Sequence, residues 1–284
     1  MAIVELRPMS LGEVLDQTFT LYRENFLLFA GITALPYLAL LAFNFALLLF
    51  RQGTKTGSTP GGVSSGMIGG VIAASLGALF IYLLLIGVAH AATVSAVGDL
   101  YLGRQASVRS SYEQAKGSFV NVIVVMILSF LAIAVGCLFL IIPGIYLACR
   151  LAVSVPATVV EKDSPVASMQ RSMELTGDYA WPMFLLLLLV FVIQMVVSGL
   201  LQLPGTVLTF MAVAAKQQPS VLVAVYNYIA QFASQVLVGP IGTISASLMY
   251  YNLRVKKEGF DIMHLMKMLD NAPRPLADPV TPAT

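Results

Sequence analysis

The 284-residue chain is 58% hydrophobic, only 11% of its residues are charged, and its formal net charge is +2. Soluble domains carry about 25% charged residues, so this composition excludes a water-soluble globule and indicates that hydrocarbon surrounds most of the surface. The small net charge gives no reason to expect a nucleic-acid partner, and membrane lipids are the predicted surroundings.

The first 25 residues predict an amphipathic helix that lies at the membrane interface. Ser10 and Glu13 have the spacing of a capping box, and apolar residues follow at helical intervals. The next apolar run, 26–50, is longer than the hydrophobic region of a cleavable signal peptide, which spans about 7–15 residues. We therefore expect this run to remain as the first membrane span.

Length and hydropathy predict six membrane spans, because about 20 apolar residues cross a bilayer core as a helix. We place them at about 26–50, 67–97, 119–142, 144–160, 181–203 and 220–250. Pro143 and Gly144 are expected to form the turn between the third and fourth spans, since proline lacks a helix donor and glycine permits the angles of a reversal. Residues 206–219 are expected to form a separate segment on the far surface.

A surface helix followed by two spans occurs three times, starting near Ser10, Ser107 and Ser164. At the third start, Ser164 is the predicted N-cap and Pro165 takes the first helical position. The predicted fold is therefore all-α: a polytopic transmembrane helical bundle of six spans with amphipathic cytoplasmic interfacial helices, arranged as three helix-plus-hairpin repeats. Residues 1–270 are expected to form one membrane-embedded domain, and residues 271–284 a disordered cytoplasmic tail.

The placement of positive charge predicts the orientation of the chain. With six spans, twelve Lys and Arg residues lie on the side that holds both termini and three on the other side. The expected location is therefore the bacterial inner membrane, with both termini cytoplasmic. A five-span alternative would place Lys162 and Arg171 outside, and it fits the charge bias less well.

Arg150 is the one charged residue between 119 and 160. An arginine at the centre of a membrane helix costs about 2.5–3.5 kcal/mol, so it should face the bundle interior, a water-filled cavity or a carboxylate. Asp99, Glu161 and Glu174 are the candidate partners. Two interpretations stay open: a snorkelling or paired structural arginine, and a member of a polar pathway.

Two polar stripes occur in the fifth and sixth spans. Both repeat every four residues and so occupy one helix face each: Gln194, Ser198 and Gln202 in the fifth span, and Asn227, Gln231 and Gln235 in the sixth. They are expected either to hydrogen-bond across helices or to line a cavity or path.

Catalytic and metal-binding patterns are not found in the sequence. His90 and His264 lie far apart, no Cys/His metal spacing occurs, and no glycine-rich phosphate loop follows a strand. We therefore expect no enzyme activity, no cofactor and no metal. His90 is expected to be a hydrogen-bonded structural residue. Cys137 and Cys149 are expected to be two small buried thiols, with a disulfide between them as the alternative.

Four stretches, 8–26, 141–161, 164–181 and 248–261, resemble the glycerophosphoryl diester phosphodiesterase membrane-domain family and related six-span YciC-like bacterial membrane proteins. The resemblance implies a membrane module without the soluble phosphodiesterase barrel. It also implies a cytoplasmic-face motif, which comprises Glu161, Arg171, Ser172, Arg254, Glu258 and Asp261, besides Arg150. The chain departs from the family at Asn252, where relatives often have Asp.

The expected function is that of a non-enzymatic scaffold or accessory module that acts on envelope lipids or on a partner membrane protein. The alternative is a transporter or channel for a small polar or lipidic solute, with Arg150 and the polar stripes lining the path. A polar cavity that joins these residues would favour transport, whereas lipid-filled lateral grooves would favour the accessory role. The oligomeric state stays open.

Overall fold

The computed structural model describes residues 8–56 and 65–259, of which 89% are helical and none lies in a strand. The helices are α1 (Leu11–Glu24), α2 (Phe26–Thr56), α3 (Ser65–Tyr101), α4 (Val108–Ala115), α5 (Phe119–Phe139), α6 (Ile141–Leu151), α7 (Ser154–Glu161), α8 (Pro165–Thr176), the 3-10 turn η1 (Gly177–Tyr179), α9 (Ala180–Ala214) and α10 (Val221–Glu258). Six segments of the described chain are long and apolar enough to cross a membrane, as the sequence predicts.

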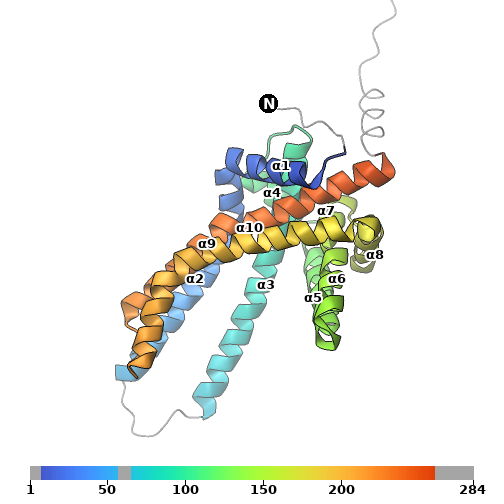
Figure 1. Cartoon of the computed structure of the whole chain (residues 1–284). Helices are drawn as coiled ribbons and strands as arrows, with labels where there is room; N and C mark the ends of the chain where they lie inside the picture. Colours follow the sequence, from blue (N-terminus) through green and yellow to red (C-terminus); the bar gives the residue numbers. More distant parts are fainter. Residues whose placement is uncertain (1–7, 57–64, 260–284) are drawn as a thin grey trace, which may run out of the picture.

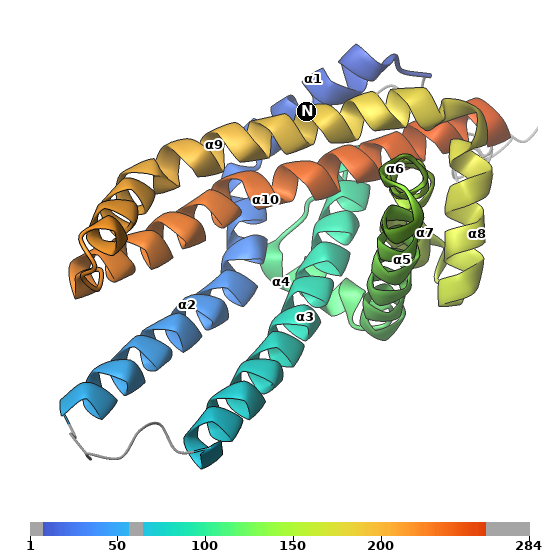
Figure 2. The same ribbon diagram turned by 60° about the horizontal axis from the view of Figure 1, so that its bottom comes forward.

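The long helices spread away from one end of the molecule. Helices α9 and α10 run side by side as an extended, bent pair, while α2 and α3 descend from this pair and separate toward their far ends (Figure 1). The α5–α6 hairpin descends beside α3 and is shorter (Figure 2). This open arrangement exposes apolar side chains over much of its length, among them Leu79, Phe130, Phe191 and Leu200.

The buried core lies at the end where α1, α3, α7 and α8 pack against α10 and α4 packs against α3. Tyr250, Ile244, Leu248 and Leu253 of α10 are fully buried there. The rings of Tyr101 and Tyr251 stack with centroids 4.9 Å apart, joining the end of α3 to α10. Water-excluded packing therefore concentrates at one end, and the exposed apolar faces of the spread helices are left for lipid.

The two described ends of the chain are held together at this core. The Asn252 amide accepts a hydrogen bond from the Met9 backbone nitrogen at 2.8 Å and donates one to the Met9 carbonyl at 3.0 Å. An amide offers both a donor and an acceptor, whereas an ionised carboxylate only accepts, which explains why Asn rather than Asp suits this position. The capping box of Ser10 and Glu13 then starts α1, which confirms the prediction for this helix start.

The α5–α6 turn lies three residues before the predicted position. Leu140, with φ −164° and ψ 146°, is the single residue between the helices, so the prediction of a turn at Pro143-Gly144 is wrong. Pro143 instead lies in the first turn of α6, where the missing donor costs little. A side chain at Gly144 would overlap Cys137, so glycine is needed for close helix packing and not for a reversal.

The tip of this hairpin is apolar and exposed. The exposed fractions of Leu138, Phe139, Leu140, Ile141 and Ile142 range from 66% to 85%. By contrast, the α9–α10 turn carries Lys216 and Gln217, which are exposed polar residues. The two hairpins therefore end in surfaces of opposite character.

Two predictions about the spans differ from the structure. The span predicted at 144–160 is interrupted between Leu151 and Ser154, so it consists of α6 and α7. Helix α9 continues through Pro204 to Ala214, and residues 206–214 are not the separate surface segment expected. Hydroxyl groups support the helix beside the proline: Thr206 donates to the Leu203 carbonyl at 2.9 Å, and Tyr226 to the Leu201 carbonyl at 2.8 Å.

Three smaller predictions are confirmed. The ring nitrogen Nδ1 of His90 lies 2.7 Å from the Thr243 hydroxyl, so this histidine is hydrogen-bonded between α3 and α10. Cys137 and Cys149 are free thiols as expected, but only Cys149 is buried, whereas Cys137 is exposed. Ser164 caps α8, with Pro165 at the start of the helix.

Candidate functional site

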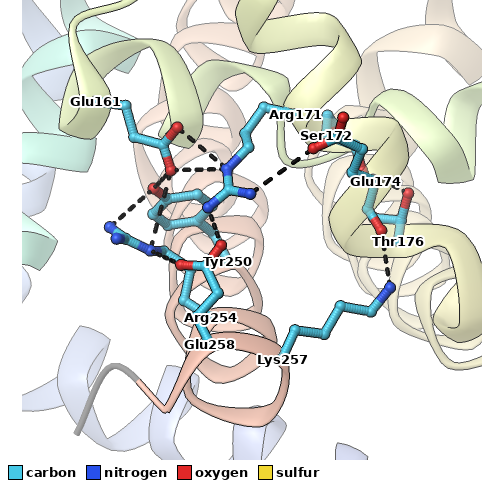
Figure 3. Close-up of polar contacts among 9 residues, drawn as sticks. All are labelled: Glu161, Arg171, Ser172, Glu174, Thr176, Tyr250, Arg254, Lys257 and Glu258. Atoms are coloured by element: carbon cyan, nitrogen blue, oxygen red, sulfur yellow. Dashed lines mark hydrogen bonds and ion pairs between the residues drawn. The ribbon is translucent and has the colours of Figure 1, made fainter. Parts of the chain in front are cut away.

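A network of charged side chains joins α7, α8 and α10 (Figure 3). Arg171 Nε lies 3.1 Å from Glu161 Oε1, and Arg254 Nε lies 3.0 Å from Glu258 Oε2. Arg171 also pairs with Glu258, which closes the network across the three helices. The Tyr250 hydroxyl donates to Glu161 Oε1 at 2.7 Å.

Local structure explains how these residues meet. Glu161 ends α7, and Lys162 follows in the left-handed region with φ 57°, which turns the chain toward the cap at Ser164. This reversal lets α8 return beside α7 and brings Arg171 to Glu161. Arg254 and Glu258 are four residues apart on α10, the spacing at which side chains on one helix face meet.

The network contains two arginines and two glutamates, so its formal charges balance. The exposed fractions of these side chains lie between 16% and 27%. Partly buried carboxylates need such partners, because removing one member leaves an uncompensated charge. Among the described residues, no group of three or more His, Cys, Asp or Glu has the arrangement of a metal site. The geometry therefore points to a clamp that holds three helices together.

Beside the network, the end of α6 is attached to α8 through a backbone carbonyl. Ser172 Oγ and Thr176 Oγ1 donate to the Arg150 carbonyl at 2.8 Å and 3.1 Å. Carbonyl groups in the last turn of a helix have no backbone donor within the helix. The two hydroxyls donate to the Arg150 carbonyl in place of that missing donor. Ser172 therefore belongs with the site through α6 and not through the charge network.

The Arg150 guanidinium lies against the end of α8. Its Nη1 is 3.2 Å from the point that a Cβ on Gly177 would occupy, and the group lies 5.8 Å from the centre of the Tyr146 ring. Arg150 has no ion pair with the expected partners: Asp99 pairs with Arg104, Glu161 belongs to the network, and Glu174 lies near Arg171. Asp178 is a nearby carboxylate that attracts Arg150.

Lys257 reaches the same place from α10. Its Nζ donates to the Glu174 carbonyl at 2.8 Å and lies 2.9 Å from Asp178 Oδ2. These contacts place a cation at the end of α8, where the helix dipole favours positive charge.

The polar stripes lie along the α9–α10 pair. Asn227 donates to Thr209 Oγ1 at 3.2 Å, a hydrogen bond across the two helices. Gln231 is exposed, whereas the other four stripe residues are half-buried: Gln194, Ser198, Gln202 and Gln235. Thirty residues of α10 separate Asn227 from Lys257, about 45 Å of helix, so this part of the stripe lies far from Arg150.

The structure thus brings together most of the predicted cytoplasmic-face motif. Glu161, Arg171, Arg254 and Glu258 form one network, Ser172 lies next to it, and Asp261 lies outside the described residues. Sequence reasoning missed Tyr250, because a tyrosine within an apolar helix gives no sign of its hydrogen-bond partner. The pair of Lys257 and Asp178 was also missed, since only the packing of α8 on α10 creates it.

An apolar groove of about 380 Å³ lies between α2 and α3. It is lined by Pro36, Ala39, Leu40, Phe43, Ala74, Gly77, Ala78, Ile81, Tyr82 and Leu85. Its volume falls within the range of about 300–1,000 Å³ typical of small-molecule sites, and only Tyr82 contributes a polar side-chain atom.

Comparisons with protein-family models, with curated proteins and with solved structures gave no match. The class of protein is inferred from the fold alone: six apolar helices in the described part of the chain indicate a multi-pass membrane protein.

Proposed function

We propose that this chain is a non-enzymatic integral membrane protein that binds membrane lipids, as a scaffold or accessory module for the envelope or for a partner membrane protein. The α2–α3 groove is the observation that carries the proposal. Its lining matches the chemistry of an acyl chain, because aliphatic and small side chains offer contact without polar groups. The proposed location is the bacterial inner membrane, with the charge network and both termini on the cytoplasmic side.

The shape of the molecule supports lipid binding over transport. In the transport alternative, Arg150 and the amide stripes would line one route. Arg150 contacts the end of α8 near Lys257, whereas Asn227 lies near the opposite end of α10. The groove between α2 and α3, in contrast, lies within a single pair of helices that are spread apart.

Two matched glycine substitutions test the proposal. Gly77 lines the groove and Gly199 lies on the exposed surface of α9; neither has an atom within 4 Å of an added Cβ. Gly77→Trp should fill the groove and reduce the phospholipid that stays bound through detergent purification, measured per chain by native mass spectrometry. Gly199→Trp should leave the amount unchanged. Equal lipid retention by the two variants would contradict the proposal.

A further inference from the structure

Two cationic groups converge on Gly177 from different helices. Arg150 Nη1 of α6 lies 3.2 Å, and Lys257 Nζ of α10 lies 3.8 Å, from the point that a Cβ at Gly177 would occupy. Lys256 adds a third positive charge on the same side, since its Nζ lies 5.3 Å from the centre of the Tyr179 ring, which Lys257 also faces. The missing side chain at Gly177 leaves both groups accessible at one point.

The carboxylates nearby do not balance this charge. Asp178 pairs with Lys257 but is 83% exposed, and Glu174 is shared with Arg171 at 3.8 Å. Glu161 and Glu258 are occupied by Arg171 and Arg254. Three cations therefore face two exposed carboxylates, and the guanidinium of Arg150 forms no ion pair within the described part of the chain.

Aromatic side chains mark the level of the membrane surface at this point. Tyr146 precedes Arg150 by one helical turn and is 53% exposed, while Trp181 follows Gly177 by four residues and is 69% exposed. Tyrosine and tryptophan favour the headgroup region of a bilayer, where one end of the ring is apolar and the other polar. Beyond them, Ile142 and Leu185 present apolar surface to the hydrocarbon.

We propose that Arg150, Lys257 and the gap at Gly177 form a binding site for the phosphate group of an anionic phospholipid. The planar guanidinium of Arg150 can donate two parallel hydrogen bonds to phosphate oxygens, and the ammonium of Lys257 adds a point charge. The acyl chains then lie along Tyr146 and Trp181. This inference rests on the proposed function, because it assigns a headgroup class to a lipid-binding protein, but it concerns a different surface from the groove.

The test compares the full-length protein in nanodiscs made of phosphatidylglycerol and phosphatidylcholine. The wild-type chain should retain phosphatidylglycerol over phosphatidylcholine in native mass spectrometry. Arg150→Gln should lower this preference about tenfold, the effect of losing a charge-assisted hydrogen-bond pair. Arg109→Gln is the matched control, since Arg109 is 91% exposed on α4 and should leave the preference unchanged.

A second variant keeps the charges and closes the gap. Gly177→Val places a side chain between Arg150 and Lys257, and it should lower the preference even if Arg150→Gln does not fold. Excess inorganic phosphate should not displace the lipid, because the aromatic flank binds only the lipid. Displacement by free phosphate, or unchanged selectivity in both variants, would overturn the site. Loss of bound lipid in Gly77→Trp with unchanged selectivity in Arg150→Gln would refute this inference alone and leave the proposed function standing.

Discussion

At the scale of single residues, the most informative position is Asn252, where an amide replaces the acid expected from the family resemblance. Its two hydrogen bonds to the Met9 backbone tie the start of the described chain to α10, and the side chain is 1% exposed. A carboxylate would place an acceptor against the Met9 carbonyl oxygen, and that contact is repulsive.

Asn252→Asp should therefore destabilise the protein by about 1–3 kcal/mol, the cost of leaving buried polar groups unsatisfied. Thermal unfolding in detergent measures the effect. The same amide-to-acid change at the exposed loop residue Gln105 should have little effect. Equal melting temperatures for the two variants would show that the Met9 contact does not contribute to stability.

At the scale of helices, the α7–α8–α10 clamp depends on Arg171, which contacts carboxylates from both α7 and α10. Arg171→Ala removes one of the positive charges that balance Glu161 and Glu258, while the two carboxylates stay close together. Because the groups are partly exposed, the expected loss is about 1–3 kcal/mol, below the cost of breaking a fully buried pair. Arg109→Ala, which removes an exposed pair with Glu113, should cost less than about 0.5 kcal/mol. Chemical denaturation in mixed micelles compares the two, and similar losses would contradict a role for the clamp.

The sequence predicts elements whose signals are local. The capping box at Ser10 and the Ser164-Pro165 helix start are confirmed, because caps depend on residues within a few positions. The turn at Leu140 and the continuation of α9 through Pro204 were missed, since both depend on helix packing and hydroxyl donors from elsewhere. The motif of Glu161, Arg171, Arg254 and Glu258 was predicted as a set, but its pairing came only from the fold.

At the scale of the whole molecule, the two ends differ in packing. The buried core lies at one end, and the helices are spread apart at the other. Residues 9 and 252 contact each other at the core end, and the α9–α10 turn lies at the far end of that helix pair (Figure 1). In a bilayer, these two ends should face opposite compartments.

Cysteine labelling tests this orientation. In a background with Cys137 and Cys149 replaced by alanine, single cysteines at the exposed positions Gln105 and Gln217 report on the two ends. A membrane-impermeant maleimide should label Gln105→Cys in inverted vesicles and Gln217→Cys in intact spheroplasts. Labelling of both from the same side would contradict the arrangement.

The apolar tip of the α5–α6 hairpin has a consequence for biosynthesis. From Phe119 to Cys149 the chain contains no charged residue, and the turn itself is a single leucine. In the predicted orientation, insertion of this hairpin moves no charge through the bilayer, whereas insertion of the α9–α10 hairpin carries Lys216 across. The α5–α6 hairpin can enter the membrane as one unit, after its neighbours have set the topology.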